Sequence, residues 1–114
     1  MISLGFESAL KSLELAQSRV AVVIEKLNAA GVDTSVATDA LNLSKSKLDE
    51  AKVKIAEVKA LIPSTDEAVT AEVFEQIKLG ARVAKDLLKE SHENIKSAIS
   101  ALKSSAPVKT GSEN

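Results

Sequence analysis

Three stretches of this chain carry apolar residues at alternating spacings of four and three, and this heptad periodicity constrains the fold more than any other feature. The first stretch aligns Phe6, Leu10, Leu13, Gln17, Val20, Ile24 and Leu27. The second aligns Ala37, Leu41, Ser44, Leu48, Ala51, Ile55, Val58 and Ile62. The third aligns Phe74, Ile77, Ala81, Ala84, Leu88, Ser91, Ile95, Ala98 and Leu102. Such a repeat is typical of α-helices that pack side by side through a narrow apolar seam.

Residues that typically end or begin helices separate the three stretches. We therefore expect helices at about residues 4–29, 36–61 and 67–103. Gly31 follows the first stretch where a left-handed C-cap is expected, and Val32 can make the apolar contact that accompanies it. Oxygens suited to N-capping the second helix come next, in Asp33, Thr34 and Ser35.

Pro63 marks the end of the second helix, because a proline pushes the residue before it out of the α region. Ser64 and Thr65 are expected to cap the third helix. The polar segment 105–114 is predicted to be a disordered tail, which leaves residues 1–104 for a single folded domain.

Short connections force neighbouring helices to run antiparallel, so the predicted fold is an all-α, up-down-up three-helix bundle with coiled-coil-like seams. The third helix is the longest, and its C-terminal turns are expected to overhang the bundle near Gly31. We predict an apolar edge on this helix that faces a partner, formed by Val83, Leu87, Ile99 and Leu102.

Each seam contains one clearly polar residue: Gln17, Ser44 and Ser91. Folding the helices about their connections brings the three to similar levels, where a polar layer would specify the register between otherwise interchangeable apolar layers. A small buried polar site and simple exposure at a seam edge are the alternatives. Gly80 lies inside the third helix, where it indicates close helix packing, a mild kink or a hinge.

Composition argues against several classes of function. Lys and Arg number 15 against 16 Asp and Glu, with no Trp or Tyr, so neither a basic surplus nor stacking aromatics support nucleic-acid binding. Absence of cysteine excludes disulfides and thiolate chemistry. No stretch has the length and apolarity of a membrane span. We therefore expect no catalytic residues, no metal site, no cofactor and no small-molecule substrate.

His92 is the single histidine, and no other metal ligand lies at helical spacing from it. The segment 91–97 is similar to the motif of histidine phosphotransfer domains, which are also helical bundles. It departs from that motif because Lys96 is four residues after the histidine, not three, and is followed by serine, not glycine. An exposed histidine on a polar helix face is the simpler interpretation.

The connection after the first helix carries the pattern L-x-x-A-G-V-D-T-S-x-A between Leu27 and Ala37. With its Ala-rich flanks, from Lys26 to Lys59, it resembles helical-hairpin segments of archaeal secreted and cell-surface proteins, and residues 72–103 are similar in character. In those proteins such helices act as spacers or stalks. The resemblance implies a structural role, although no signal peptide is visible.

We expect a non-enzymatic structural or protein-interaction module, which could be a spacer, an assembly subunit or a surface-protein domain, that binds a protein partner or a second copy of itself. The alternative is a small cytosolic regulatory protein of the immunity or antitoxin type that occludes a protein partner. The localisation expected is the cell surface or exterior if a signal peptide was removed, and the cytoplasm if Met1 is the native start.

Overall fold

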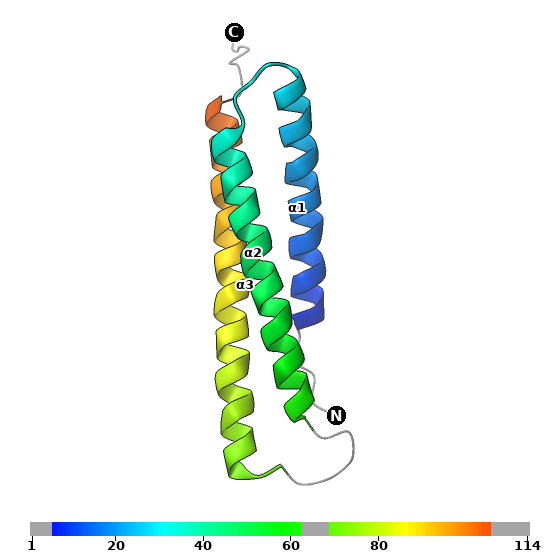
Figure 1. The fold of residues 1–114 in the computed structure, drawn as a ribbon, viewed down its shortest axis with the longest axis vertical. Coiled ribbons are helices and arrows are strands. Elements are labelled where there is room, and N and C mark those ends of the chain that lie inside the picture. The colour runs from blue at the N-terminus through cyan, green and yellow to red at the C-terminus, as the bar shows by residue number, and fades with distance from the viewer. Residues whose placement is uncertain (1–5, 63–68, 106–114) are drawn as a thin grey trace.

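A computed structural model describes residues 6–62 and 69–105 of the chain, and these residues form three helices with no strand (Figure 1). Helix α1 spans Phe6–Ala29, α2 spans Ser35–Leu61 and α3 spans Ala71–Ser105. Consecutive helices run antiparallel, so α1 and α3 point the same way. The predicted all-α, three-helix architecture is confirmed.

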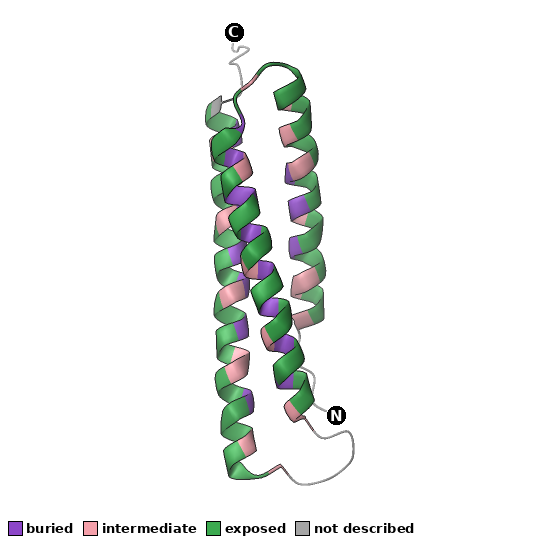
Figure 2. Cartoon of the chain, viewed as in Figure 1, coloured by how far each residue is buried: buried purple, intermediate pink, exposed green. Residues whose placement is uncertain are grey.

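Helices α2 and α3 pack closely along most of their length, whereas α1 lies further from both (Figure 1). Buried residues form a continuous stripe on the facing sides of α2 and α3, and only Leu13, Gln17 and Val20 are buried on α1 (Figure 2). The stripe is rich in small side chains, which let two helix backbones approach closely. Its smallest members are Ala37, Ala40, Ser44, Ala51, Ala84, Ser91 and Ala98.

The connection between α1 and α2 has the C-cap geometry that its sequence predicts. Gly31 has a φ of 87°, its N–H bonds to the carbonyl of Asn28, and the N–H of Val32 bonds to the carbonyl of Leu27. These two bonds define a Schellman motif, which satisfies carbonyls that the helix end leaves free.

Asp33 supplies the side-chain oxygen at the start of α2. Its Oδ1 accepts hydrogen bonds from the N–H of Ser35 at 3.0 Å and from the Ser35 hydroxyl at 2.8 Å. The bond from the Ser35 N–H, supported by the hydroxyl, lowers the pKa of the Asp33 carboxyl. Thr34 takes the N-cap position without a side-chain bond.

The helix ends on either side of residues 63–68 differ in how well they match expectation. Ile62 is extended, with φ of −81° and ψ of 122°, as a residue before proline should be. The predicted start of α3 at residue 67 is wrong, because Val69 and Thr70 are not helical and the Thr70 hydroxyl accepts the N–H of Val73. Thr70 is therefore the cap, and the predicted caps Ser64 and Thr65 lie outside the described residues.

At the other end, α3 continues to Ser105, two residues beyond the helix end expected at about residue 103. Residues 106–114, which make up nearly all of the predicted disordered tail, lie outside the described residues.

The predicted overhang of α3 is at the wrong end. Leu102 is only 7% exposed, and the last turns of α3 lie level with the α1–α2 connection. Instead, the first turns of α3 extend past the start of α1 (Figure 1). Phe74 lies in these turns and is 51% exposed with Lys78 over its ring, so it is not part of the buried seam.

Gly80 lies where α3 packs directly against Val58 of α2. A Cβ at this position would overlap with Cγ2 of Val58, a side chain that is 1% exposed. Close packing of the two helices, the first of the interpretations offered by the sequence, explains why glycine is present in the helix interior.

We predict that Gly80→Ala destabilises the protein, although alanine is the better helix former by about 1 kcal/mol. The new methyl group meets a stiff, buried β-branched side chain, and overpacking of this kind costs about 1–3 kcal/mol. In a Val58→Ala background the obstacle is removed, so the same change should raise the free energy of unfolding. Urea denaturation of the four proteins measures both effects, and equal stabilisation in both backgrounds would contradict the packing.

Candidate interaction surface

The three polar seam residues lie together in the interior. Gln17 is 7% exposed, and Ser44 and Ser91 are fully buried. The Ser44 hydroxyl accepts a hydrogen bond from Nε2 of Gln17 at 3.0 Å, which joins α1 to α2, and Ser44 also bonds to Ser91 of α3.

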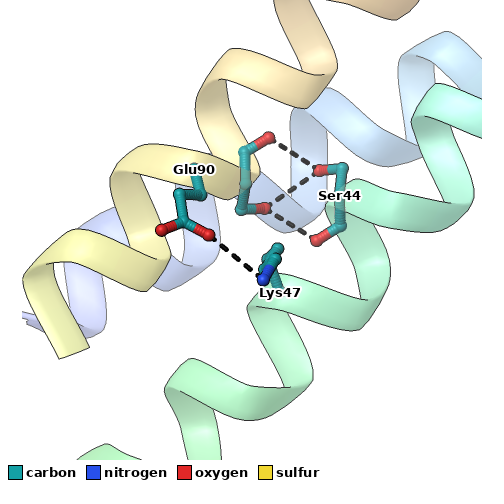
Figure 3. Close-up of polar contacts among 4 residues, drawn as sticks. Ser44, Lys47 and Glu90 are labelled. Carbon is teal, nitrogen blue, oxygen red and sulfur yellow. Dashed lines mark hydrogen bonds and ion pairs between the residues drawn. The ribbon is translucent and has the colours of Figure 1, made fainter. Parts of the chain in front are cut away.

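The two serines hold α2 and α3 together by a reciprocal pair of bonds (Figure 3). The hydroxyl of Ser44 donates to the carbonyl of Ser91 at 2.9 Å, and the hydroxyl of Ser91 donates to the carbonyl of Ser44 at 2.8 Å. A hydroxyl reaches the opposite backbone only when the two helices are very close. The layer contains one amide and two hydroxyls, so it has no group that titrates or acts as a nucleophile with an adjacent base.

Ion pairs bridge the two sides of the bundle that involve α2. Lys47 of α2 lies 3.2 Å from Glu90 of α3 (Figure 3), and the hydrogen bond to Glu90 raises the pKa of the Lys47 ammonium. Two further pairs, Lys52 with Glu14 and Lys59 with Glu7, join α2 to α1. Exposed pairs of this type contribute at most about 1 kcal/mol each, but they favour one arrangement of charges.

The third side, between α1 and α3, is different. Within residues 6–62 and 69–105, no ion pair joins these two helices. Two adjoining hollows of about 440 and about 390 Å³ lie there. Together they form a groove, here named the α1–α3 groove, lined by Ser12, Leu15, Ala16, Arg19, Val20, Val23, Leu27, Ile99, Leu102 and Lys103.

The walls of this groove are mainly aliphatic and partly open to solvent. Val23 is 43% exposed and Ile99 is 40% exposed, whereas Val20 and Leu102 are buried at its floor. Leu15 extends the apolar surface along α1. The groove is thus a place where the hydrophobic core reaches the surface.

The four residues that we expected to face a partner do not form one surface. Ile99 and Leu102 line the α1–α3 groove, but Leu102 is buried at its floor. Val83 is exposed and Leu87 is half-buried. At about 100° per residue, Val83 and Leu87 lie on one flank of the α3 seam and Ile99 lies on the other.

Sequence reasoning missed the α1 side of the groove. Leu15, Ala16 and Val23 are not among the residues that the sequence predicted to face a partner. The available signal was the combination of these residues at successive flank positions. They make α1 apolar well beyond the width that one neighbouring helix covers.

His92 is exposed on α3, and no group of three or more His, Cys, Asp or Glu residues suited to a metal ion occurs in the described part of the chain. None of the three helices, as far as their residues are described, is long and apolar enough to cross a membrane.

Comparison of the chain with protein-family models, with curated proteins and with solved structures finds no significant match.

The reciprocal bonds predict that two substitutions of Ser44 lower the free energy of unfolding by different amounts. Ser44→Ala removes hydroxyl bonds to both neighbouring helices and should lower the free energy of unfolding by about 1 kcal/mol. Ser44→Val adds volume between two backbones already in close approach, and should lower it by about 2 kcal/mol or more. Chemical denaturation gives both values. The same substitutions at exposed Ser46 are the control, expected within about 0.5 kcal/mol, and a valine at residue 44 that stabilises the protein would contradict the geometry.

Proposed function

We propose that this chain is a non-enzymatic helical-bundle module for protein–protein interaction, with the α1–α3 groove as its binding surface. One observation carries the proposal: Val23 and Ile99 are large apolar side chains, both about two-fifths exposed, on the two walls of one open groove. Exposed aliphatic residues that gather around a concavity mark a place where another molecule binds.

The shape of the groove favours a helix as the occupant. Two parallel helices with an aliphatic floor between them present the space that an additional helix fills in a four-helix bundle. An amphipathic helix that lays its apolar face into such a groove is a common mode of protein recognition. Small-molecule sites need several convergent polar groups to orient the ligand, and this groove has few.

This proposal is compatible with the structural role that we expected, as a spacer, assembly subunit or surface-protein domain. The bundle is elongated, and one of its sides has an apolar groove that another protein can bind. A cytosolic regulator of the immunity or antitoxin type would use the same groove to occlude a different protein. The two differ in the identity of what binds, which the following experiment determines.

A photo-crosslinking amino acid placed at residue 23 tests the proposal in cells that express the protein. Val23 is on the groove wall, and Ser97 is an exposed control on the side of α3 opposite Ile99. We expect protein adducts from residue 23 at several times the yield from residue 97, identified by mass spectrometry. Equal yields at the two positions, or no adduct at residue 23, would overturn the proposal.

A further inference from the structure

The rims of the α1–α3 groove are basic. Arg19 and Lys103 line the groove itself. One heptad from each of them, on the same flanks, are Lys26 of α1 and Lys96 of α3, both exposed. Lys96 also lies 3.8 Å from Glu93.

The flank of α3 that contains Ile99 continues with His92 and Lys85 at heptad spacing, and both are exposed. Neither these positions nor the groove-facing positions of α1 carry a carboxylate. Cations on both sides oppose a closer approach of α1 to α3, and they favour an occupant that brings negative charge.

The outward face of α2 has the opposite character. The positions that point away from its buried seam include four carboxylates and two large exposed aliphatic residues, and no lysine or arginine. We name this set the α2 outer face: Asp39, Asn42, Leu43, Ser46, Asp49, Glu50, Val53 and Glu57. Leu43 is 55% exposed and Val53 is 60% exposed.

The lysines of α2 flank this face, and most of them form ion pairs with glutamates of α1 or α3. Lys52 and Lys59 pair with glutamates of α1, and Lys47 pairs with Glu90 of α3. Lys54 bonds to Glu57 at 2.8 Å within α2. In the described part of the chain, Asp39, Asp49 and Glu50 take part in no salt bridge, so the α2 outer face keeps a net negative charge.

The two surfaces lie on opposite sides of the bundle, since the α1–α3 side of a three-helix arrangement is across from α2. Their lengths are similar: the groove from Ser12 to Leu27 covers about 23 Å, and the outer face from Asp39 to Glu57 covers about 27 Å. The hydrogen bond between Gln17 and Ser44 shows that both lie at the same level along the bundle.

Building on the proposed function, we propose that the α1–α3 groove binds the α2 outer face of a second copy of this chain. If a second copy is displaced sideways from the first, without sliding along the bundle axis, the α2 outer face of one copy meets the α1–α3 groove of the other. The incoming α2 is then antiparallel to both α1 and α3, as in an antiparallel four-helix bundle. Leu43 and Val53 supply apolar contacts. The bonds between Ser44 and Ser91 place Asp39 and Glu50 level with Lys96 and Lys85 on the α3 flank.

Because the two contact surfaces differ, the association is head-to-tail. Each copy that binds through its groove still presents a free α2 outer face to another, so assembly extends into a row unless rotation closes it into a ring. A contact of one helix face in one groove is small, so each step is weak and reversible. Its electrostatic part should weaken as salt concentration increases.

Single-cysteine variants test this pairing cleanly, because the chain has no cysteine of its own. Chains with Ala16→Cys, which lines the groove at the level of Ser46, are mixed at low ionic strength with chains that carry Ser46→Cys on the α2 outer face. Mild oxidation should give the mixed disulfide at least about tenfold faster than a mixture of Ser46→Cys with the control Ser97→Cys, because binding raises the local thiol concentration. Equal rates would overturn the proposal.

Charge reversal separates a specific contact from random collisions. Adding Asp39→Lys and Glu50→Lys to the Ser46→Cys chain should reduce the rate to that of the control. Adding Lys85→Glu and Lys96→Glu to the Ala16→Cys chain should then restore it, because these lysines lie level with Glu50 and Asp39. Failure of this rescue would overturn the charge pairing, and circular dichroism of each variant confirms that it remains helical.

The proposed function and this inference fail in distinguishable ways. Adducts from residue 23 that contain a different protein, combined with equal disulfide rates, would retain the interaction module and overturn self-assembly. Adducts that contain a second copy of the chain, combined with the fast mixed disulfide, support both.

Discussion

The close approach of α2 to α3 is the constraint on which the rest of the structure depends. Small residues recur where the two helices face each other, and Gly80 leaves just enough space for the side chain of Val58. At this separation the hydroxyls of Ser44 and Ser91 reach the opposite backbone, which they could not do across a leucine layer. The bonds in turn specify the register, because sliding one helix by a turn would leave buried polar groups without partners.

The position of α1 follows from this tight pair. Its seam carries larger side chains, such as Leu13, and it contacts the pair along a narrower strip. Ion pairs from Glu7 and Glu14 tie it to α2. Towards α3 it presents apolar and basic residues, and α3 presents the same combination in return. Like charges on the two helices disfavour a closer approach, and Val23 and Ile99 remain exposed between them.

The heptad pattern predicted the helices and the membership of nearly every buried position from the sequence, because burial on a helix follows a period that local spacing reveals. The same holds for Gly31 and Ile62, whose backbone geometry depends on their immediate neighbours. A polar layer could also be expected from the sequence, since Gln17, Ser44 and Ser91 interrupt otherwise apolar seams.

The start of α3 at Ala71 was not foreseeable, because several possible capping residues precede it. The exposure of Phe74 was not foreseeable either, because it depends on the level at which α1 packs against α3, which is a tertiary property. The groove was hidden for the same reason: a flank residue such as Val23 looks identical in sequence whether a neighbouring helix covers it or not. Interaction surfaces of bundles are set by which sides the helices leave uncovered, and that choice depends on long-range packing and charge.

Native-state hydrogen exchange tests the central claim most directly, because it measures the free energy of opening at each amide. If α2 and α3 form one closely packed unit on which α1 rests, the central amides of α2 and α3, around Ser44 and Ser91, should open only with global unfolding. Amides of α1 should then exchange through a separate opening of lower free energy. Equal protection in all three helices, or α2 and α3 opening before α1, would contradict this account.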